Sequence, residues 1–166
     1  MTFPFDLEAA TNAIAALELA VVGIGTSYGY NANPVEVDHT DLATGAVVVH
    51  SPLGPRNAAD GVVSGLLSYG SVFQLDYRIT SRVLFSESKG ENYPADEAGA
   101  SVLWKVIADT FFNHANRTSL ATSAGAHTYS TEFADPSFGI KPWPMDSPGF
   151  REYWALEYNH IFTFTG

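Results

Sequence analysis

The chain has 166 residues, of which 46% are hydrophobic and 16% are charged. This is the size of one ordinary domain, with enough apolar material for a buried core and too few charges for a disordered chain. The formal net charge is -10, eight Lys and Arg residues are scattered from Arg56 to Arg151, and cysteine is absent. These features argue against counterion-release binding to nucleic acid and exclude disulfides, thiol catalysis and a cysteine zinc site.

Neither the N-terminal residues nor the longest apolar stretch indicates membrane insertion. The N-terminal residues 1–6 lack the basic start of a signal peptide. The longest apolar stretch, from Ile14 to Ile24, is interrupted by Glu18 and Gly23, and a bilayer span needs ~20 apolar residues. We therefore expect no contact with a membrane, and the lack of cysteine fits a chain made in a reducing cytoplasm.

The first half of the chain predicts a leading helix followed by strands. Apolar residues recur at helical spacing over residues 5–19, at Leu7, Ala10, Ile14 and Leu17. Residues 20–29 are apolar and then glycine-rich, which predicts a short strand, and residues 31–45 read as a loop. The β-branched run of residues 46–50 predicts a buried strand.

The second half contains two long alternating segments. Over residues 71–85 apolar and polar residues alternate, which predicts a strand with aromatic side chains on one face and charges on the other. Residues 95–114 predict a second helix, opened by Pro94. Residues 127–133 and 152–165 predict two further strands, separated by an irregular proline-rich loop at about 135–150.

This order predicts the α+β class. Because the strands are mostly consecutive, we expect a mostly antiparallel sheet with two helices packed on one face, in a single domain of residues 1–166. A long alternating strand of this kind has one wet face, which is available for a partner.

The glycines of residues 23–29 have the outline of a dinucleotide-binding turn. That motif needs a helix beginning within it, so that backbone amides face a pyrophosphate. Residues 28–34 follow here, and they contain Pro34 and cannot sustain a helix. We therefore expect bends or a β-bulge in a strand, and no bound cofactor.

No residue pattern identifies a catalytic or metal site. The histidines show neither His-x-His nor His-x-x-x-His spacing, and each reads as an isolated strand or loop residue; they are His39, His50, His114, His127 and His160. The polar run of residues 38–41 reads as solvated loop rather than a metal site, since no second ligand pair accompanies it. Ser64-Gly65 only half-matches a nucleophile elbow. We expect no catalytic residue, no metal and no enzyme activity.

The proline-rich segment carries large apolar side chains although it is predicted to be an irregular loop. It is too rich in proline for regular structure, yet it includes five large apolar residues, namely Phe138, Ile140, Trp143, Met145 and Phe150. One interpretation is a flap that covers the chain's own core. The other is an arm that docks on a neighbouring subunit, with Trp143 as its anchor.

The order of these elements resembles the tail terminator, or tail completion, proteins of long-tailed bacteriophages. The resemblance rests on residues 7–19, 46–50, 71–86 and 95–114 and on the aromatic ending of residues 154–165. It covers most of the chain, and it is one of architecture rather than of a diagnostic motif. Extra residues at about 20–45 and 135–150 depart from the family's pattern.

The resemblance implies a virion structural protein without catalytic residues. Such proteins form a ring, usually of six subunits, that caps the head-proximal end of the tail tube and joins it to the neck. The implied partners are other copies, the tail-tube proteins, and the neck or head-completion proteins. DNA would pass through the ring without specific binding. For the contact between subunits we predict a set of residues on the polar face of 71–85 and on the proline-rich segment, namely Asp76, Arg78, Arg82, Phe138, Ile140, Trp143 and Met145.

Two alternatives remain open at this stage. The chain could instead be another neck, head-completion or tail-tube subunit of the virion. In a different class, it could be a small α+β cone that binds or converts an apolar ligand in an aromatic pocket. That pocket would be lined by Tyr77, Tyr129, Trp154 and Tyr158, with His127 or His160 as a general base.

Overall fold

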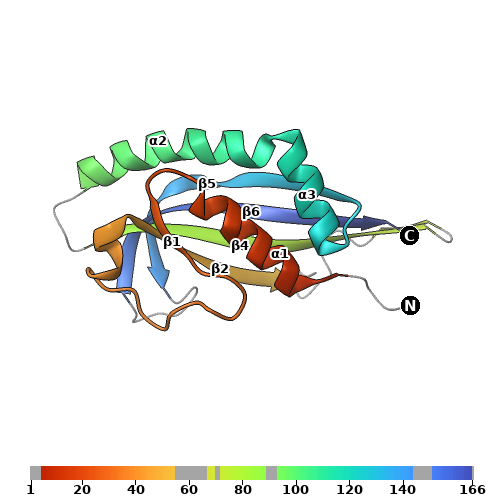
Figure 1. Ribbon diagram of the computed structural model, residues 1–166, viewed down its shortest axis with the longest axis horizontal. Helices are drawn as coiled ribbons and strands as arrows, with labels where there is room; N and C mark the ends of the chain where they lie inside the picture. Colours follow the sequence, from red (N-terminus) through yellow and green to blue (C-terminus); the bar gives the residue numbers. More distant parts are fainter. Residues whose placement is uncertain (1–4, 55–66, 70–71, 89–92, 144–150, 166) are drawn as a thin grey trace.

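A computed structural model describes residues 5–54, 67–69, 72–88, 93–143 and 151–165 (Figure 1). The helices are α1 (Leu7–Leu19), α2 (Tyr93–Phe112) and α3 (His114–Ala124), with a short 3-10 turn, η1, at Asp41–Thr44. The strands are β1 (Ile24–Ser27), β2 (Ala46–Gly54), β3 (Leu67–Tyr69), β4 (Val72–Glu87), β5 (Thr128–Trp143) and β6 (Arg151–Thr165). The predicted α+β class is confirmed.

In the described part of the chain the strands form one sheet, in the order β1-β2-β4-β6-β5, and β3 pairs with β4. The pair β1–β2 is parallel and the others are antiparallel, so the sheet is mixed but mostly antiparallel, as expected. Its centre is the long pair β4–β6, whose register runs from Gln74 opposite Thr165 to Glu87 opposite Tyr153. The two long alternating segments of the sequence are therefore neighbours.

The alternation along these strands separates two cores. On one face, Ile79 and Val83 of β4 and Phe162 of β6 pack with apolar residues of α1, α2 and α3. On the other face, Leu84 of β4 joins a smaller core, whose other buried members are Val37, Val47, Val49, Trp143, Tyr153 and Ala155. The period of two predicted for these strands holds, but both faces are partly covered.

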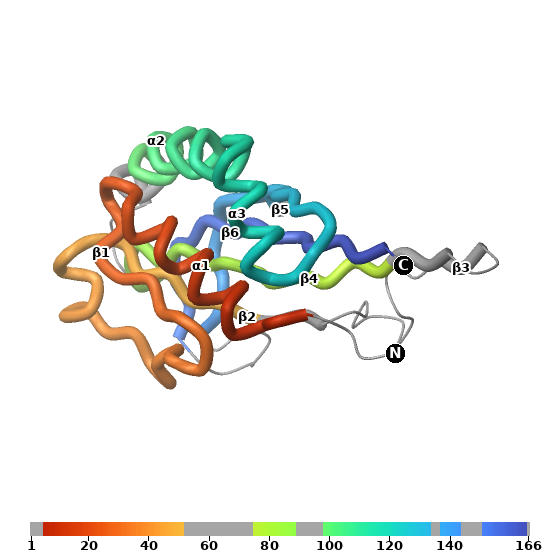
Figure 2. The backbone as a smooth tube through the Cα atoms, turned by 45° about the vertical axis from the view of Figure 1, so that its right-hand side comes forward, coloured from red at the N-terminus to blue at the C-terminus, as the bar shows by residue number. Residues whose placement is uncertain are grey.

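The helix predicted at 95–114 is α2, and a further helix that was not predicted, α3, follows it directly. Asn113 leaves the helical backbone conformation, with ψ at 128°, and its Oδ1 accepts hydrogen bonds from the backbone amides of Ala115 and Asn116. Asparagine is a favoured residue at a helix start, which explains the new helix. Figures 1 and 2 show α3 beside α1, and the Asp6 amide donates to the Ala124 carbonyl at 3.2 Å.

The proline-rich segment is less irregular than predicted, because β5 continues through it to Trp143. Phe138 to Trp143 pair with Leu156 to Arg151 of β6, after a register shift that begins at Phe133. Strand β5 ends the sheet order, and a proline is tolerated in an edge strand because no neighbour needs its missing amide hydrogen. Residues 144–150 lie outside the described residues.

The glycine run forms a bulged strand, as expected. The register of β1 against β2 shifts between Ile24 and Thr26. A Cβ on Gly25 would lie 2.9 Å from the backbone of Thr44, and Gly45 has a positive φ of 138°. These glycines let β1 approach the end of η1 closely. In the described residues no helix begins within the run, and none of the helices there is long and apolar enough to cross a membrane.

Phe111 is the residue of α2 on which the larger core most depends. It is fully buried, and its ring lies 4.8 Å from that of His160 and 5.9 Å from that of Tyr158. We expect Phe111→Ala to lower the free energy of unfolding by about 3–5 kcal/mol, because the cavity cannot collapse fully. Phe112→Ala is the matched control, because Phe112 is the next residue and is 53% exposed. It should lower the free energy of unfolding by about half a kcal/mol or less. Urea unfolding of both variants measures the difference, and equal losses would contradict this packing.

Candidate functional site

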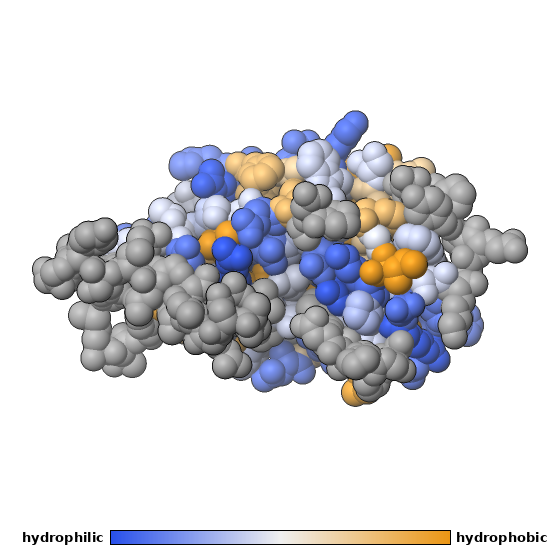
Figure 3. Space-filling view, turned by 180° about the vertical axis from the view of Figure 1, so that it is seen from behind, coloured by the Kyte–Doolittle hydropathy of each residue, from blue (hydrophilic) through white to orange (hydrophobic). Residues whose placement is uncertain are grey.

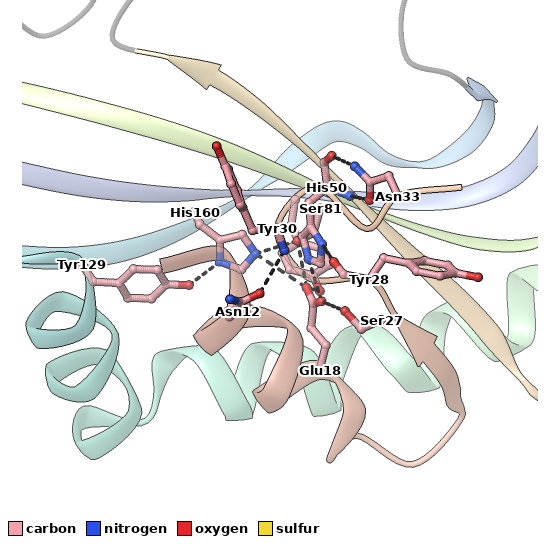
Figure 4. A network of polar contacts seen from close by, with 11 residues as sticks. Asn12, Glu18, Ser27, Tyr28, Tyr30, Asn33, His50, Ser81, Tyr129 and His160 are labelled. Atoms are coloured by element: carbon pink, nitrogen blue, oxygen red, sulfur yellow. Dashed lines mark hydrogen bonds and ion pairs between the residues drawn. The ribbon is translucent and has the colours of Figure 1, made fainter. Parts of the chain in front are cut away.

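The most concentrated group of polar side chains surrounds the carboxylate of Glu18, which is fully buried beneath α1 (Figure 4). Oε1 accepts hydrogen bonds from Ser81 at 2.8 Å and from the Tyr158 hydroxyl at 2.6 Å. Oε2 accepts from Ser27 at 2.6 Å and from Nε2 of His50 at 2.8 Å. Four donors from four different strands thus converge on one carboxylate, which must therefore be ionised.

The two hydrogen-bond partners of His50 require a protonated ring. Its Nδ1 lies 2.6 Å from the backbone carbonyl of Tyr28, and its Nε2 contacts the Glu18 carboxylate. Both partners only accept hydrogen bonds, so both ring nitrogens donate. His50 and Glu18 therefore form a buried ion pair between α1 and β2.

His160 has the opposite state. Because the Ser81 hydroxyl donates to Glu18, its oxygen accepts from Nε2 of His160 at 2.8 Å. The Nδ1 of His160 lies 2.5 Å from the Tyr129 hydroxyl, which also contacts Thr131; because burial lowers the pKa of His160 and favours the neutral ring, Nδ1 accepts from this hydroxyl. A ring that donates through one nitrogen and accepts through the other is neutral. The network thus runs from α1 across the sheet to the edge strand β5.

The electrostatics agree with this arrangement of protons. Burial alone would raise the pKa of Glu18, but the charge of His50 and the nearby His160 hold it below its ordinary value. Burial alone would lower the pKa of His50, but the Glu18 charge and its hydrogen bonds raise it. For His160 burial prevails, helped by repulsion from His50, so its pKa is lowered. Burial and the Glu18 charge raise the pKa of Tyr158.

Local sequence explains why these side chains meet. Glu18 follows Ala10 and Ile14 on the buried stripe of α1, four residues further along each time. It sits in the last turn, where the helix dipole disfavours an anion, so its stability must come from the surrounding donors. His50, Ser81 and His160 occupy inward positions of β2, β4 and β6, on the face beneath α1. No two of these side chains are close in sequence.

The cluster has the parts of a nucleophilic site but no opening. Ser81 and His160 are within the distance of a nucleophile and its base. Ser81, His160, Glu18 and Tyr158 are nevertheless all 0% exposed, and the proton of Ser81 is directed to Glu18. The Ser81 hydroxyl is therefore covered by its own chain in this arrangement.

The residues predicted to line an aromatic pocket are only partly together. Tyr129, Tyr158 and His160 meet in the Glu18 cluster, where they are packed and hydrogen-bonded. Tyr77 instead packs on Phe5, with ring centroids 4.2 Å apart, and His127 is exposed. An apolar groove of about 600 Å³ exists elsewhere, between α2 and the β1–η1 region, and its lining includes Val22, Leu42, Phe85 and Val102.

The structure places the residues predicted for the contact between subunits in different surroundings. Asp76 and Arg78 lie on the second sheet face, which carries the smaller core, but outside that core; we call this part the polar half of the second sheet face. There Asp76 accepts from Thr163, and Arg78 is 3.5 Å from Glu132. Arg82 is buried and pairs with Glu157 at 2.5 Å. Trp143 is 6% exposed, and its Nε1 donates to the Pro34 carbonyl at 3.0 Å. For this residue the structure therefore agrees with a flap that covers the chain's own core.

The remaining residues predicted for the contact belong, like Trp143, to the proline-rich segment. Ile140 is 49% exposed, and Phe138 is partly buried, with its ring 5.8 Å from that of Trp154. Met145 lies outside the described residues. The exposed candidates in β5 are therefore Ile140 and, in part, Phe138.

The polar run of residues 38–41 forms a hydrogen-bonded turn of its own that leads into η1. Asp38 accepts from the amides of Thr40 and Asp41, while Asp41 accepts from the amide of Asp38. Within the described ranges, no group of three or more His, Cys, Asp or Glu side chains could hold a metal ion. No protein-family model matches the sequence, and a search of curated proteins finds no relative.

The Glu18 cluster predicts a stability maximum near pH 6.5. The raised pKa of His50 contributes stability below its ordinary value of 6.5, which is lost as the pH rises through the folded value. The lowered pKa of His160 makes protonation costly, so stability also falls as the pH drops below 6.5. Glu18 adds a further loss below its ordinary value of 4.5.

Thermal unfolding from pH 4 to 9 measures how stability falls on both sides of the maximum, along an acid limb below pH 6.5 and an alkaline limb above it. His50→Gln should flatten the alkaline limb, and His160→Gln should flatten the acid limb between pH 6.5 and 4.5. His114→Gln, at an exposed histidine on α3, should leave both limbs in place. An unchanged profile in His50→Gln would show that this ring is not protonated in the folded chain.

Removing the Glu18 carboxylate should create a site for a small anion. Glu18→Ala leaves the donors of His50, Ser81 and Tyr158 around a cavity, and we expect a loss of about 3–5 kcal/mol. Formate should restore part of the melting temperature, because it binds only the folded state. Glu18→Leu fills the space and should show no formate effect. Equal responses in the two variants would argue against the carboxylate as the centre of the network.

Proposed function

We propose that this chain is a virion structural subunit that assembles into a ring, in the manner of phage tail terminators. The observation that carries the proposal is the burial of the acid–base groups. In the described part of the chain, the Glu18 carboxylate and its hydrogen-bond donors are buried and hold α1 to the sheet, which favours a role for the surface in contacts with other chains. The predicted order of a leading helix, strands, a second helix and closing strands is present in the structure, with α3 added after the second helix.

The surface offers material for such contacts. Large apolar side chains are exposed on several elements, among them Val22 at 90%, Val35 at 82% and Ile140 at 49%. A ring needs a heterologous interface, in which one patch meets a different patch of the next subunit. We assign one side to the polar half of the second sheet face, with Asp76 and Arg78, and the other to Ile140 and Phe138 on β5. Arg82 and Trp143 are left out, because each is buried in its own chain.

The proposed place is the head-proximal end of the tail, with the tail tube on one side and neck or head-completion proteins on the other. The net charge of -10 supports a passage in which DNA slides without being held, since like charges repel. Other neck, head-completion and tail-tube subunits share these physical requirements. The partner that the ring binds distinguishes them.

Electron microscopy of the purified protein, alone and mixed with tail tubes, tests the proposal. We expect rings that sit at one end of each tube. Ile140→Asp should abolish the rings, because a buried interfacial charge without a partner is costly. Val35→Asp makes the same change at a more exposed residue outside the proposed contact and should leave the rings intact. A protein that stays single-copy at high concentration and binds no virion component would refute the proposal.

A further inference from the structure

The outward side of α2 carries large apolar residues that its own chain leaves uncovered. Figures 1 and 2 show α2 as the outermost layer, and Figure 3 shows apolar and hydrophilic side chains mixed along the upper edge, where α2 lies. The inward stripe of the helix consists of Leu103, Ile107 and Phe111, all buried. On the outward side Val102 is 67% exposed and Phe112 is 53% exposed.

Five residues form this outward stripe, because they recur at three- and four-residue spacing along the helix. They are Val102, Lys105, Val106, Asp109 and Phe112, and all are exposed. The stripe thus has one positive charge, one negative charge and an apolar residue near each end. Among the residues that the structure describes, neither Lys105 nor Asp109 takes part in an ion pair within the chain.

The stripe is complementary to a copy of itself. If two α2 helices lie antiparallel with their outward sides together, about a twofold axis at the height of Ile107 along the helix, residues equally far from the axis in sequence face each other. Lys105 then faces the partner's Asp109, and Val102 faces the partner's Phe112, and the symmetry makes each contact twice. Val106 lies next to the axis, where a small apolar residue allows the two helices to approach closely.

Net charge adds a second reason for a contact at this place. Two chains that each carry -10 repel one another, so copies can meet only where the surface is locally balanced. The stripe is such a place, since its single Lys and single Asp cancel. We propose that α2 is a self-association surface through which two copies pair in an antiparallel, twofold contact centred near Val106. This contact is separate from the head-to-tail contact of a ring, and it does not depend on the proposed function.

Charge reversal tests the pairing, measured by sedimentation equilibrium of the full chain over a wide concentration range. Lys105→Asp places acidic residues opposite each other twice per dimer and should weaken the dimer by at least about tenfold. Asp109→Lys should do the same with basic residues. The double variant Lys105→Asp with Asp109→Lys should restore dimerisation, because the complementarity returns with the signs exchanged.

A second pair of variants tests the apolar part. Val106→Lys puts two like charges at the axis and should leave only monomers, whereas Val35→Lys, at a more exposed valine in a loop, should dimerise as the wild type does. Circular dichroism confirms that each variant is folded. A wild-type chain that is monomeric at every concentration, or a double reversal that fails to restore the dimer, would overturn the pairing. Rings that persist in Lys105→Asp would leave the ring proposal standing, and rings lost only in Ile140→Asp would separate the two contacts.

Discussion

One buried carboxylate determines how the helix layer meets the sheet. Glu18 is fully buried, and its four donors come from β1, β2, β4 and β6. An isolated charge in a protein interior is very unfavourable, so α1 can bury this residue only where all four donors are in place. Purely apolar packing would tolerate a helix that slides or rotates on the sheet. The carboxylate instead makes one position of α1 much better than its neighbours.

The same interaction explains why two chemically identical histidines differ. His50 meets two acceptors, the Tyr28 carbonyl and the Glu18 carboxylate, and is held as a cation. His160 meets the Ser81 oxygen as a donor and the Tyr129 hydroxyl as an acceptor, and stays neutral. With one cation and one anion, the cluster is electrically neutral although it contains five titratable groups, namely Glu18, His50, Tyr129, Tyr158 and His160. That neutrality lowers the cost of burying the group, in which Glu18 and His160 are 0% exposed and His50 is 2% exposed.

The regular parts of this fold were predictable from local pattern. The period of two over residues 71–85 and 152–165 predicts β4 and β6 because each strand presents one apolar face to a core. The glycines of residues 23–29 predict a bulged strand for an equally local reason. The end of β5 was missed because an edge strand tolerates prolines that a central strand would not. Helix α3 was missed because its sequence is mostly small and polar and buries only Leu120, Ala121 and Ala124, so it lacks a wide apolar stripe.

The Glu18 cluster could not be predicted in this way. Tyr158 is 140 residues from Glu18 in sequence, and Ser81 is 63 residues away, so no spacing rule connects them. Two weak signals were present. Glu18 lies on the apolar stripe of a helix, and His50 ends a run of three valines, so each is a polar group placed where burial is expected. Polar residues at buried positions need partners, and that requirement predicts a network without saying which residues complete it.

Charge distribution connects the interior to assembly. The excess of acidic over basic residues, 18 against 8, is a barrier to any contact between copies. Each surface assigned here to such contacts sets a basic residue beside its acidic ones: Lys105 near Asp109 on α2, and Arg78 near Asp76 and Glu132 on the second sheet face. Exposed acidic residues such as Glu8 on α1 leave acidic charge away from those surfaces. An assembly that joins balanced patches leaves its acidic excess facing water or a passage, so repulsion opposes disordered aggregation while permitting the specific contacts.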